Sequence, residues 1–264
     1  MAVDAFVAES RVLHRDLSSR PQNIVSGSGI SFTLESGKVI IDASSGPSVS
    51  ILGHHQPEVT AAIVKQLDRI GYIYSGSKHT CDVAEELASE ILSGSPGGLV
   101  KAIFVNSGSE ATDAALKLAT QYWCELGETT RVNFIARKQS YHGNTIGALS
   151  VSGHESRRAY YQPWMAHNVT FVDPCFAYRA KLNGEDDEQY VIRLKEQLED
   201  EILRLGPSSV AGFVAETVSG TTLGCLPATP GYFNAVREVC DKYGVLLILD
   251  ELRLTSTLSP IQAS

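Results

Sequence analysis

Short apolar runs alternate with amphipathic helical segments from Val100 to Asp250, and this alternation limits the fold more than any other feature of the sequence. A parallel sheet with helices on both faces has this pattern, because each connection between neighbouring strands is a helix that packs on the sheet. We therefore expect an α/β fold with a mostly parallel sheet. The expected strands are residues 100–105, 132–136, 168–172, 210–216 and 245–250, and the longer helices are 109–127, 188–206 and 230–244.

The first part of the chain has a different pattern of apolar residues. Residues 29–46 contain two short runs suited to strands around a turn at Ser36 and Gly37. Residues 55–70 and 80–94 then have apolar side chains at helical spacing. The sequence predicts a small sheet followed by two helices.

Composition excludes several classes of partner. The formal net charge is −8, and no clustered basic stripe offsets it, so we expect no nucleic-acid partner. The apolar runs fall short of the roughly 18 residues needed to cross a bilayer. Acids at Asp4, Glu9 and Asp16 interrupt the segment where a signal peptide needs an apolar core. We expect a cytoplasmic protein with no membrane segment, and the histidine spacing suggests no metal site.

Residues that follow the expected strands are the candidates for function, because ligands of such sheets bind at the carboxyl edge. After the strand at 100–105, Gly108 permits close approach of a ligand, and Ser109 can cap the helix that follows. The free N–H groups of the first helical turn favour an anion such as phosphate. An ordinary strand-to-helix turn with a serine cap explains these residues equally well.

Two acids end neighbouring expected strands, Glu216 and Asp250. A buried carboxylate must be paired, hydrogen-bonded or neutral. The two acids could be acid–base partners, as in hydrolases, or one could hold a protonated ring nitrogen while the other orients a side chain. After another strand, Tyr141 could stack on a flat ligand with His142 beside it, although such a pair more often serves packing or the surface.

Four stretches together closely resemble the class III aminotransferases, which are pyridoxal-phosphate enzymes of fold type I. They occur in family order and with family-like spacing, and the resemblance covers roughly residues 11–252. It implies the cofactor pyridoxal 5'-phosphate, an amino donor and a keto-acid acceptor as substrates, and a homodimer. The stretches are IDASSGPSVSILGHHQPEV, FVNSGSEATDAALKLA, SYHGNTIGALSVSG and AETVSGTTLGCLPATPGYFNAVREVCDKYGVLLILDE.

The resemblance implies roles in cofactor binding. Ser107, Gly108 and Ser109 look like the phosphate cradle, and Tyr141 looks like the residue that stacks on the pyridine ring. Asp250 looks like the acid that pairs with the pyridine nitrogen, where its charge keeps that nitrogen protonated and the ring an electron sink.

Four further residues gain roles in the same way. His142 lies next to the stacking residue, and Glu216 matches the active-site glutamate of the family. Leu252 takes the place of the apolar residue under the ring. Tyr74, in GYIYSG, lies in a segment that resembles part of the substrate pocket.

One residue of the family has no counterpart, the Schiff-base lysine that anchors the cofactor. After Glu251 the sequence reads LRLTSTLSPIQAS, and no lysine follows Lys242. Because that amine is both anchor and proton-transfer base, we expect the chain as given to be inactive and carboxy-terminally truncated. A frameshift, a splice variant, an incomplete gene prediction and a natural short paralogue all stay open.

The resemblance also predicts domains and topology. Residues 1–50 form a segment of the small domain, 51–252 an incomplete cofactor-binding large domain, and 253–264 an aberrant tail. Two further strands of the family lie between 100–105 and 210–216, so their absence leaves a strand edge unpaired and favours aggregation.

Other functions stay open beside transamination. Another fold type I reaction, such as that of an aminomutase or a decarboxylase, needs the same lysine. The chain could also be a non-catalytic subunit that pairs with a full-length homologue. A Ser-His-Asp hydrolase is more distant, because the sequence contains no G-x-S-x-G.

Overall fold

The computed structural model describes residues 10–94, 98–220 and 222–251 of the 264-residue chain. This part of the chain falls into two compact units, divided between Ile91 and Leu92. The boundary expected between residues 50 and 51 concerns the domains of the family and stays a prediction. The expected tail at 253–264 lies outside the described residues.

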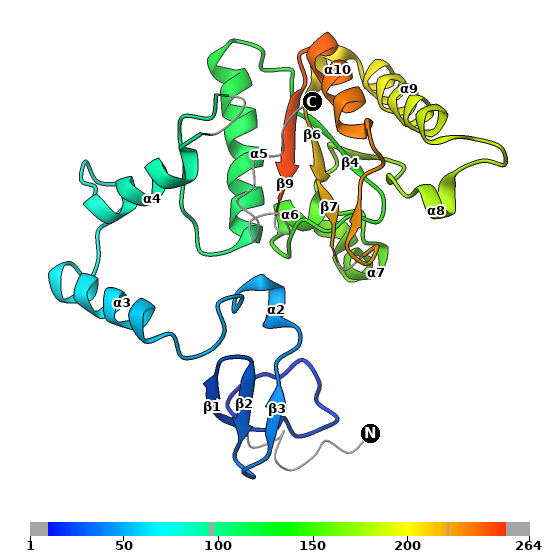
Figure 1. Ribbon diagram of the computed structural model, residues 1–264. Coiled ribbons are helices and arrows are strands. Elements are labelled where there is room, and N and C mark those ends of the chain that lie inside the picture. The colour runs from blue at the N-terminus through cyan, green and yellow to red at the C-terminus, as the bar shows by residue number, and fades with distance from the viewer. Residues whose placement is uncertain (1–9, 95–97, 221, 252–264) are drawn as a thin grey trace. The chain divides into compact units, whose positions relative to one another are not determined.

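The first unit contains a small antiparallel sheet with strand order β1-β2-β3, and helices (Figure 1). Two of the strands flank Ser36 and Gly37, which confirms the prediction for residues 29–46. The two longer helices confirm the predictions for 55–70 and 80–94. The elements are β1 (Ile24–Ser28), β2 (Ser31–Leu34), β3 (Val39–Ile41), α2 (Ser45–Ser48), α3 (Pro57–Arg69) and α4 (Asp82–Leu92).

The apolar stripe of α3 is exposed within the described part of the chain. Val59, Ile63 and Leu67 have 44%, 55% and 57% of their surface exposed. Neither α3 nor α4 has a buried residue among those described. Because most helix stability in proteins comes from burying the apolar stripe, these helices gain little from packing among the described residues.

The second unit is built on a parallel sheet with helices on both faces, as the alternation predicts (Figure 1). The strand order is β5-β4-β6-β9. All four strands were predicted from their apolar runs. They are β4 (Asn133–Arg137), β5 (Val169–Val172), β6 (Val210–Glu216) and β9 (Leu246–Asp250).

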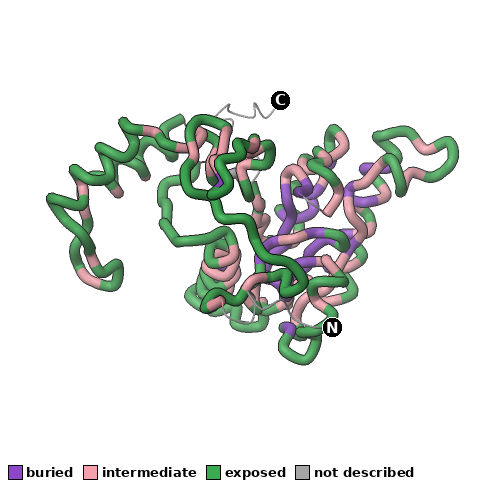
Figure 2. The backbone as a smooth tube through the Cα atoms, turned by 90° about the horizontal axis from the view of Figure 1, so that it is seen from below, coloured by how far each residue is buried: buried purple, intermediate pink, exposed green. Residues whose placement is uncertain are grey.

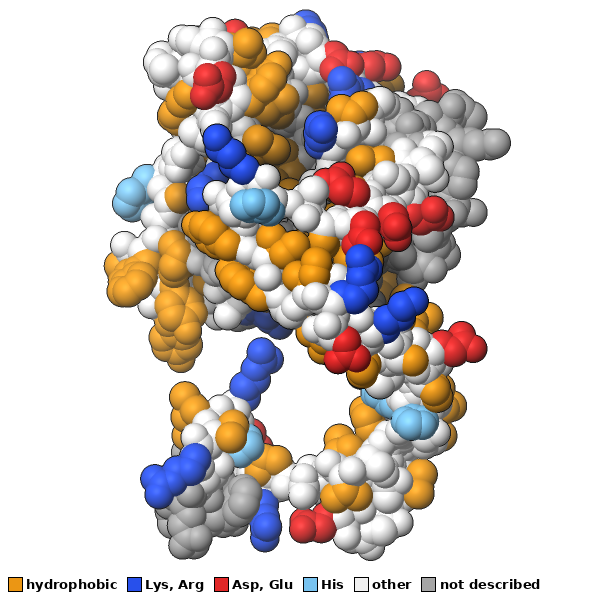
Figure 3. Space-filling view, turned by 90° about the vertical axis from the view of Figure 1, so that its left-hand side faces the viewer, with side chains coloured by type: hydrophobic (Ala, Val, Ile, Leu, Met, Phe, Trp, Pro, Cys, Tyr) orange, Lys and Arg blue, Asp and Glu red, His pale blue; other side chains and the backbone are white. Residues whose placement is uncertain are grey.

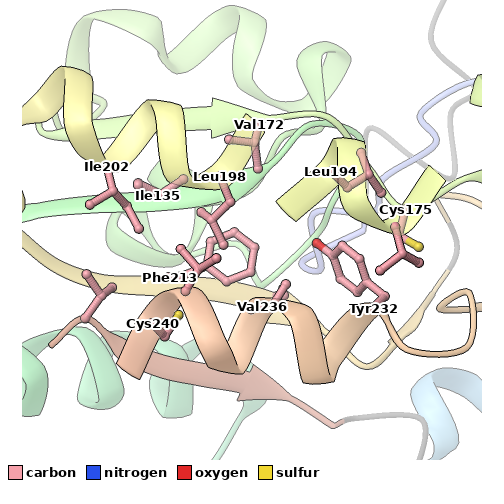
Figure 4. Close-up of a cluster of buried hydrophobic side chains, with 14 of the residues drawn as sticks. Ile135, Val172, Cys175, Leu194, Leu198, Ile202, Phe213, Tyr232, Val236 and Cys240 are labelled. Atoms are coloured by element: carbon pink, nitrogen blue, oxygen red, sulfur yellow. The ribbon is translucent and has the colours of Figure 1, made fainter. Parts of the chain in front are cut away.

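The two faces of this sheet bury different side chains, because successive residues of a strand point to opposite faces. Ile135 and Phe213 pack with α9 (Asp187–Leu205) and α10 (Tyr232–Tyr243), as Figure 4 shows. Phe134, Ala136 and Val214 pack instead with α5 (Gly108–Glu125). Burial is concentrated in this unit (Figure 2), and each large apolar side chain contributes about 1.5–3 kcal/mol there.

Shorter elements connect the strands and helices of the second unit. Among the described residues, none of the helices has the length and apolar character that crossing a membrane requires. The short elements are α6 (Ile146–Ser150), α7 (Glu155–Arg158), η1 (Ala159–Trp164), α8 (Ala177–Ala180), η2 (Pro207–Ser209), and the antiparallel pair β7 (Val218–Ser219) and β8 (Leu226–Pro227).

One predicted strand is absent from the described residues. Residues 100–105 form no strand, and the apolar side chains there are exposed, with Ile103 at 74% and Phe104 at 49%. A strand requires a hydrogen-bonded neighbour, and no described strand pairs with this segment. Among the described strands, β6 lies between β4 and β9, and β9 is the outermost strand on that side of the sheet.

Exposed apolar surface accompanies that open edge. Hydrophobic side chains are exposed over the face shown in Figure 3, and Leu249 of β9 is 41% exposed. An unpaired apolar edge is a template for another strand. We therefore keep the prediction that the 264-residue chain self-associates.

The substitution Leu249→Lys is expected to lower this self-association, because a lysine on an edge strand opposes pairing with a second strand. Sedimentation velocity of the 264-residue chain measures the associated fraction. The control is Leu203→Lys, which places the same charge on α9 at a leucine that is 51% exposed. Equal association of the two variants would contradict the edge explanation, and a monodisperse parent chain with a sharp two-state melt would contradict the prediction of self-association.

Stability is expected to fall at high pH. Burial raises the pKa of Tyr232 from 10.0 to about 12 and the pKa of Cys240 from 9.0 to about 12. A raised pKa contributes stability that is complete below the unfolded value and is lost as pH rises through the folded value. The free energy of unfolding should therefore decline between about pH 9 and pH 12.

Urea unfolding followed by tryptophan fluorescence measures this decline. The variant Tyr232→Phe should show a smaller decline, because its side chain does not ionise. The control Tyr178→Phe, at a tyrosine that is 82% exposed, should behave like the parent chain. Identical pH dependence of all three proteins would refute the assignment to Tyr232.

Candidate active site

Residues predicted from separate stretches meet at the carboxyl edge of the second unit's sheet. Glu216 and Asp250 are register partners at the ends of β6 and β9. His142 follows β4, and its Nδ1 lies 2.9 Å from Oδ2 of Asp250. The N–H of Asn144 donates to Oγ of Ser109 at 2.9 Å, which joins the start of α5 to the same cluster.

The start of α5 is capped differently from the prediction. Ser107, and not Ser109, is the N-cap, and its Oγ accepts a hydrogen bond from the N–H of Glu110 at 3.2 Å. Ser109 is the second helical residue, so its hydroxyl serves the contact with Asn144. The N–H groups of Gly108 and Ser109 have no acceptor within the helix, since first-turn amides lack one. They remain suited to an anion.

Gly143 allows the loop after β4 to approach α5 closely. Its φ is +140°, and a Cβ there would lie 2.6 Å from Oγ of Ser109 and 2.8 Å from Cβ of Ala148. Beside it, the Oγ1 of Thr112 donates to the carbonyl of His142 at 2.8 Å. The loop is therefore fixed against the first turns of α5.

Glu216 is buried, and both of its carboxylate oxygens accept backbone N–H groups. Oε1 accepts from Gly220 at 2.9 Å, and Oε2 accepts from Tyr141 at 3.4 Å. Asp250 contacts His142 instead. Of the two alternatives left open for the acids, this arrangement favours the one in which Glu216 orients its neighbours and does not act as an acid–base partner of Asp250.

Sequence reasoning missed two arginines at the site. Arg137 is 3% exposed, and its Nη2 donates to the main-chain oxygen of Glu216 at 2.5 Å. The sequence did contain a sign of this residue's role, because an arginine at the end of an otherwise apolar strand is unusual and needs a partner. Arg157 lies over the ring of Tyr141 at 4.4 Å and covers one face of it. No pattern in the sequence links those two residues, and a flat ligand would use the other face of the ring.

For two predicted residues, the structure does not test a place in this cluster. Tyr74 belongs to the first unit and is 64% exposed, so its place beside the cofactor site stays a prediction. Leu252 lies outside the described residues.

The residues of the cluster fit the cofactor that the resemblance implies. The amides of Gly108 and Ser109 suit a phosphate, the ring of Tyr141 suits a flat heterocycle, and the carboxylate of Asp250 suits a protonated ring nitrogen. These groups lie on connected segments of one unit.

Comparison with known proteins decides the family. The profile described as aminotransferase class-III matches residues 14–254. The chain belongs to the class III aminotransferases. These enzymes depend on pyridoxal phosphate, and a solved omega transaminase from Pseudomonas jessenii in complex with PMP is similar to this chain, with a TM-score of 0.86 and 28% identity. That similarity covers 92% of this chain and 54% of the transaminase.

Curated relatives agree with this family and are longer. A protein of Schizosaccharomyces pombe named as an uncharacterized aminotransferase is 49% identical over 233 residues, which are 88% of this chain and 50% of the relative. Gamma aminobutyrate transaminase 3 of Solanum lycopersicum is 35% identical, over 82% of this chain and 41% of its own length. The chain thus spans about half the length of the curated relatives it matches, or less.

The substitution Gly143→Ala is expected to destabilise the second unit by about 1–3 kcal/mol, because the new Cβ overlaps Ser109 and Ala148. Urea unfolding with tryptophan fluorescence measures the change, since Trp123 is buried in this unit's core. The control is Gly108→Ala, where a Cβ would meet no atom within 4 Å. Equal effects of the two substitutions would contradict the close approach of the loop and α5.

Proposed function

We propose that this cluster binds pyridoxal phosphate and serves the transfer of an amino group from an amino donor to a keto acid or an aldehyde. The observation that carries the proposal is the contact of Asp250 with the buried His142, in a loop held against the start of α5. The two contacts link the carboxylate of Asp250, through the loop of residues 142–144, to a helix start whose amides suit phosphate. Membership of the class III aminotransferases supports the choice of cofactor and reaction.

Each residue then has a physical task. The bound cofactor supplies an electron sink for the reaction. The amides of Gly108 and Ser109 bind the phosphate, and the negative charge of Asp250 holds a proton on the ring nitrogen. The ring of Tyr141 orients the heterocycle and excludes water from one of its faces. Glu216 fixes the main chain of Tyr141.

The covalent part of the reaction needs a lysine amine. From residue 138 onward the chain has four lysines, and each has an acidic partner: Lys138 pairs with Asp173, Lys181 with Asp187, Lys195 with Glu238 and Lys242 with Glu199. We propose that the 264-residue chain by itself binds the cofactor without a covalent bond and does not complete the reaction.

Substrate and assembly follow from the relatives only as proposals. The tomato relative named for gamma aminobutyrate supports a donor with a terminal amino group. We propose a homodimer, which is the assembly that the family resemblance implies, and a cytoplasmic location. The open edge of β9 favours a second candidate, a non-catalytic subunit that pairs with a full-length homologue. An aminomutase or a decarboxylase would use the same cluster.

Titration of the 264-residue chain with pyridoxal phosphate tests the proposal. Tyr141→Ala should weaken binding about tenfold, since stacking contributes up to about 1.5 kcal/mol. The control Tyr160→Ala, at a tyrosine that is 89% exposed, should leave binding unchanged. Absorbance or fluorescence of the cofactor gives the affinity.

Borohydride reduction followed by peptide mass spectrometry tests the covalent part separately. We expect no lysine of the chain to carry the cofactor. A specific lysine adduct would disprove the noncovalent proposal, whereas absence of any binding, or equal weakening by both tyrosine variants, would disprove the proposed site.

A further inference from the structure

Two side chains from one short turn lie close to the phenol ring of Tyr141. The Cζ atom of Arg157 lies over one face of this ring, 4.4 Å from its centre. The imidazole of His154 is nearly perpendicular to the ring, with 6.4 Å between the two ring centres. The carbonyl of His154 accepts the N–H of Arg157 at 3.1 Å and that of Arg158 at 3.2 Å. Both contacts of the ring therefore come from the same turn.

We infer that Arg157 is a positioning residue for Tyr141: its guanidinium stacks on one face of the phenol ring and fixes the ring plane, so that a flat ligand meets the opposite face. The consequence for cofactor binding rests on the proposed function. The coupling between the two side chains does not, because it follows from contacts within the chain.

The ring is the partner that the structure gives to this guanidinium. Among the described residues, no carboxylate forms an ion pair with Arg157, and its side chain makes no hydrogen bond. A guanidinium is planar and stacks on aromatic rings, and 4.4 Å is well within the roughly 6 Å over which a cation is attracted to a ring face. Because Arg157 is exposed to solvent, the contact has the modest strength of a surface cation–π pair.

Arg158 anchors the turn that carries Arg157. Its Nη1 donates to the carbonyls of Ser150 at 2.8 Å and Ser152 at 2.7 Å, and its guanidinium lies 4.7 Å from the ring centre of Phe171 in β5. The helix α7 has only four residues, and a helix of this length depends on such tertiary contacts for its stability. The place of Arg157 over the ring is thus set through the next residue of the chain.

The main chain of Tyr141 is held separately, since its N–H donates to Oε2 of Glu216 at 3.4 Å. The rotation that remains is that of the side chain about its own torsions. A stacked cation restricts this rotation before a ligand arrives, and a ring that is already ordered costs the ligand less binding free energy. Loss of Arg157 is therefore expected to weaken binding of a stacked cofactor about 2- to 5-fold, the range of an exposed cation–π contact.

The first experiment measures the coupling of the two side chains without cofactor. Urea unfolding with tryptophan fluorescence gives the unfolding equilibrium constant of the 264-residue chain and its variants. Arg157→Gln should raise this constant about 2- to 5-fold in the parent chain and in Tyr141→Phe, which keeps the ring. In Tyr141→Leu, which removes the ring, Arg157→Gln should have almost no effect. Equal effects in all three backgrounds would overturn the inference.

The second experiment repeats the comparison with pyridoxal phosphate. Arg157→Gln should weaken binding about 2- to 5-fold in the parent chain and in Tyr141→Phe, and should leave the affinity of Tyr141→Leu unchanged. A guanidinium that only attracted the phosphate by its charge would weaken binding in every background. That result would disprove the positioning role.

The matched control is Arg179→Gln. It removes the same charge from an arginine that lies 5.0 Å from the ring centre of Tyr178, a tyrosine that is 82% exposed. The control should keep the cofactor affinity of the parent chain, and a loss as large as that of Arg157→Gln would count against the inference. If the parent chain binds no cofactor, the proposed function fails, while the unfolding cycle still decides whether Arg157 holds the ring.

Discussion

Parallel pairing in register between β6 and β9 is the constraint on which the rest of the site depends. It sets Glu216 beside Asp250 at one edge of the sheet. The two faces of the sheet pack against different helices, and this packing holds the register. A slip by one residue would move every side chain of the strand to the opposite face of the sheet. The chemistry at the strand ends is thus fixed by the core, and the two acids take different tasks because their neighbours differ.

Close approach between a loop and a helix completes the site. Gly143 lets the segment after β4 lie against α5, so that His142 reaches Asp250 while Asn144 bonds to Ser109. Three regions distant in sequence are thereby connected through short hydrogen bonds. The arrangement joins a helix start suited to an anion to an oriented, partly exposed carboxylate, which is the pair of features that a phosphorylated heterocycle requires.

The sequence predicted the four paired strands, the two longer helices of the first unit and the cluster at the strand ends, because these depend on local periodicity. It failed at 100–105, where strand propensity lacks a partner strand in the described residues. The cap at Ser107 and the cation over Tyr141 depend on local geometry and tertiary contacts that spacing does not reveal.

A crystal structure of the 264-residue chain with pyridoxal phosphate tests the central claim most directly. The cluster predicts phosphate oxygens within hydrogen-bond distance of the amides of Gly108 and Ser109, and a ring nitrogen that faces the carboxylate of Asp250 with His142 behind it. Cofactor density at another place on a correctly folded chain, or no density at a saturating concentration, would contradict the account.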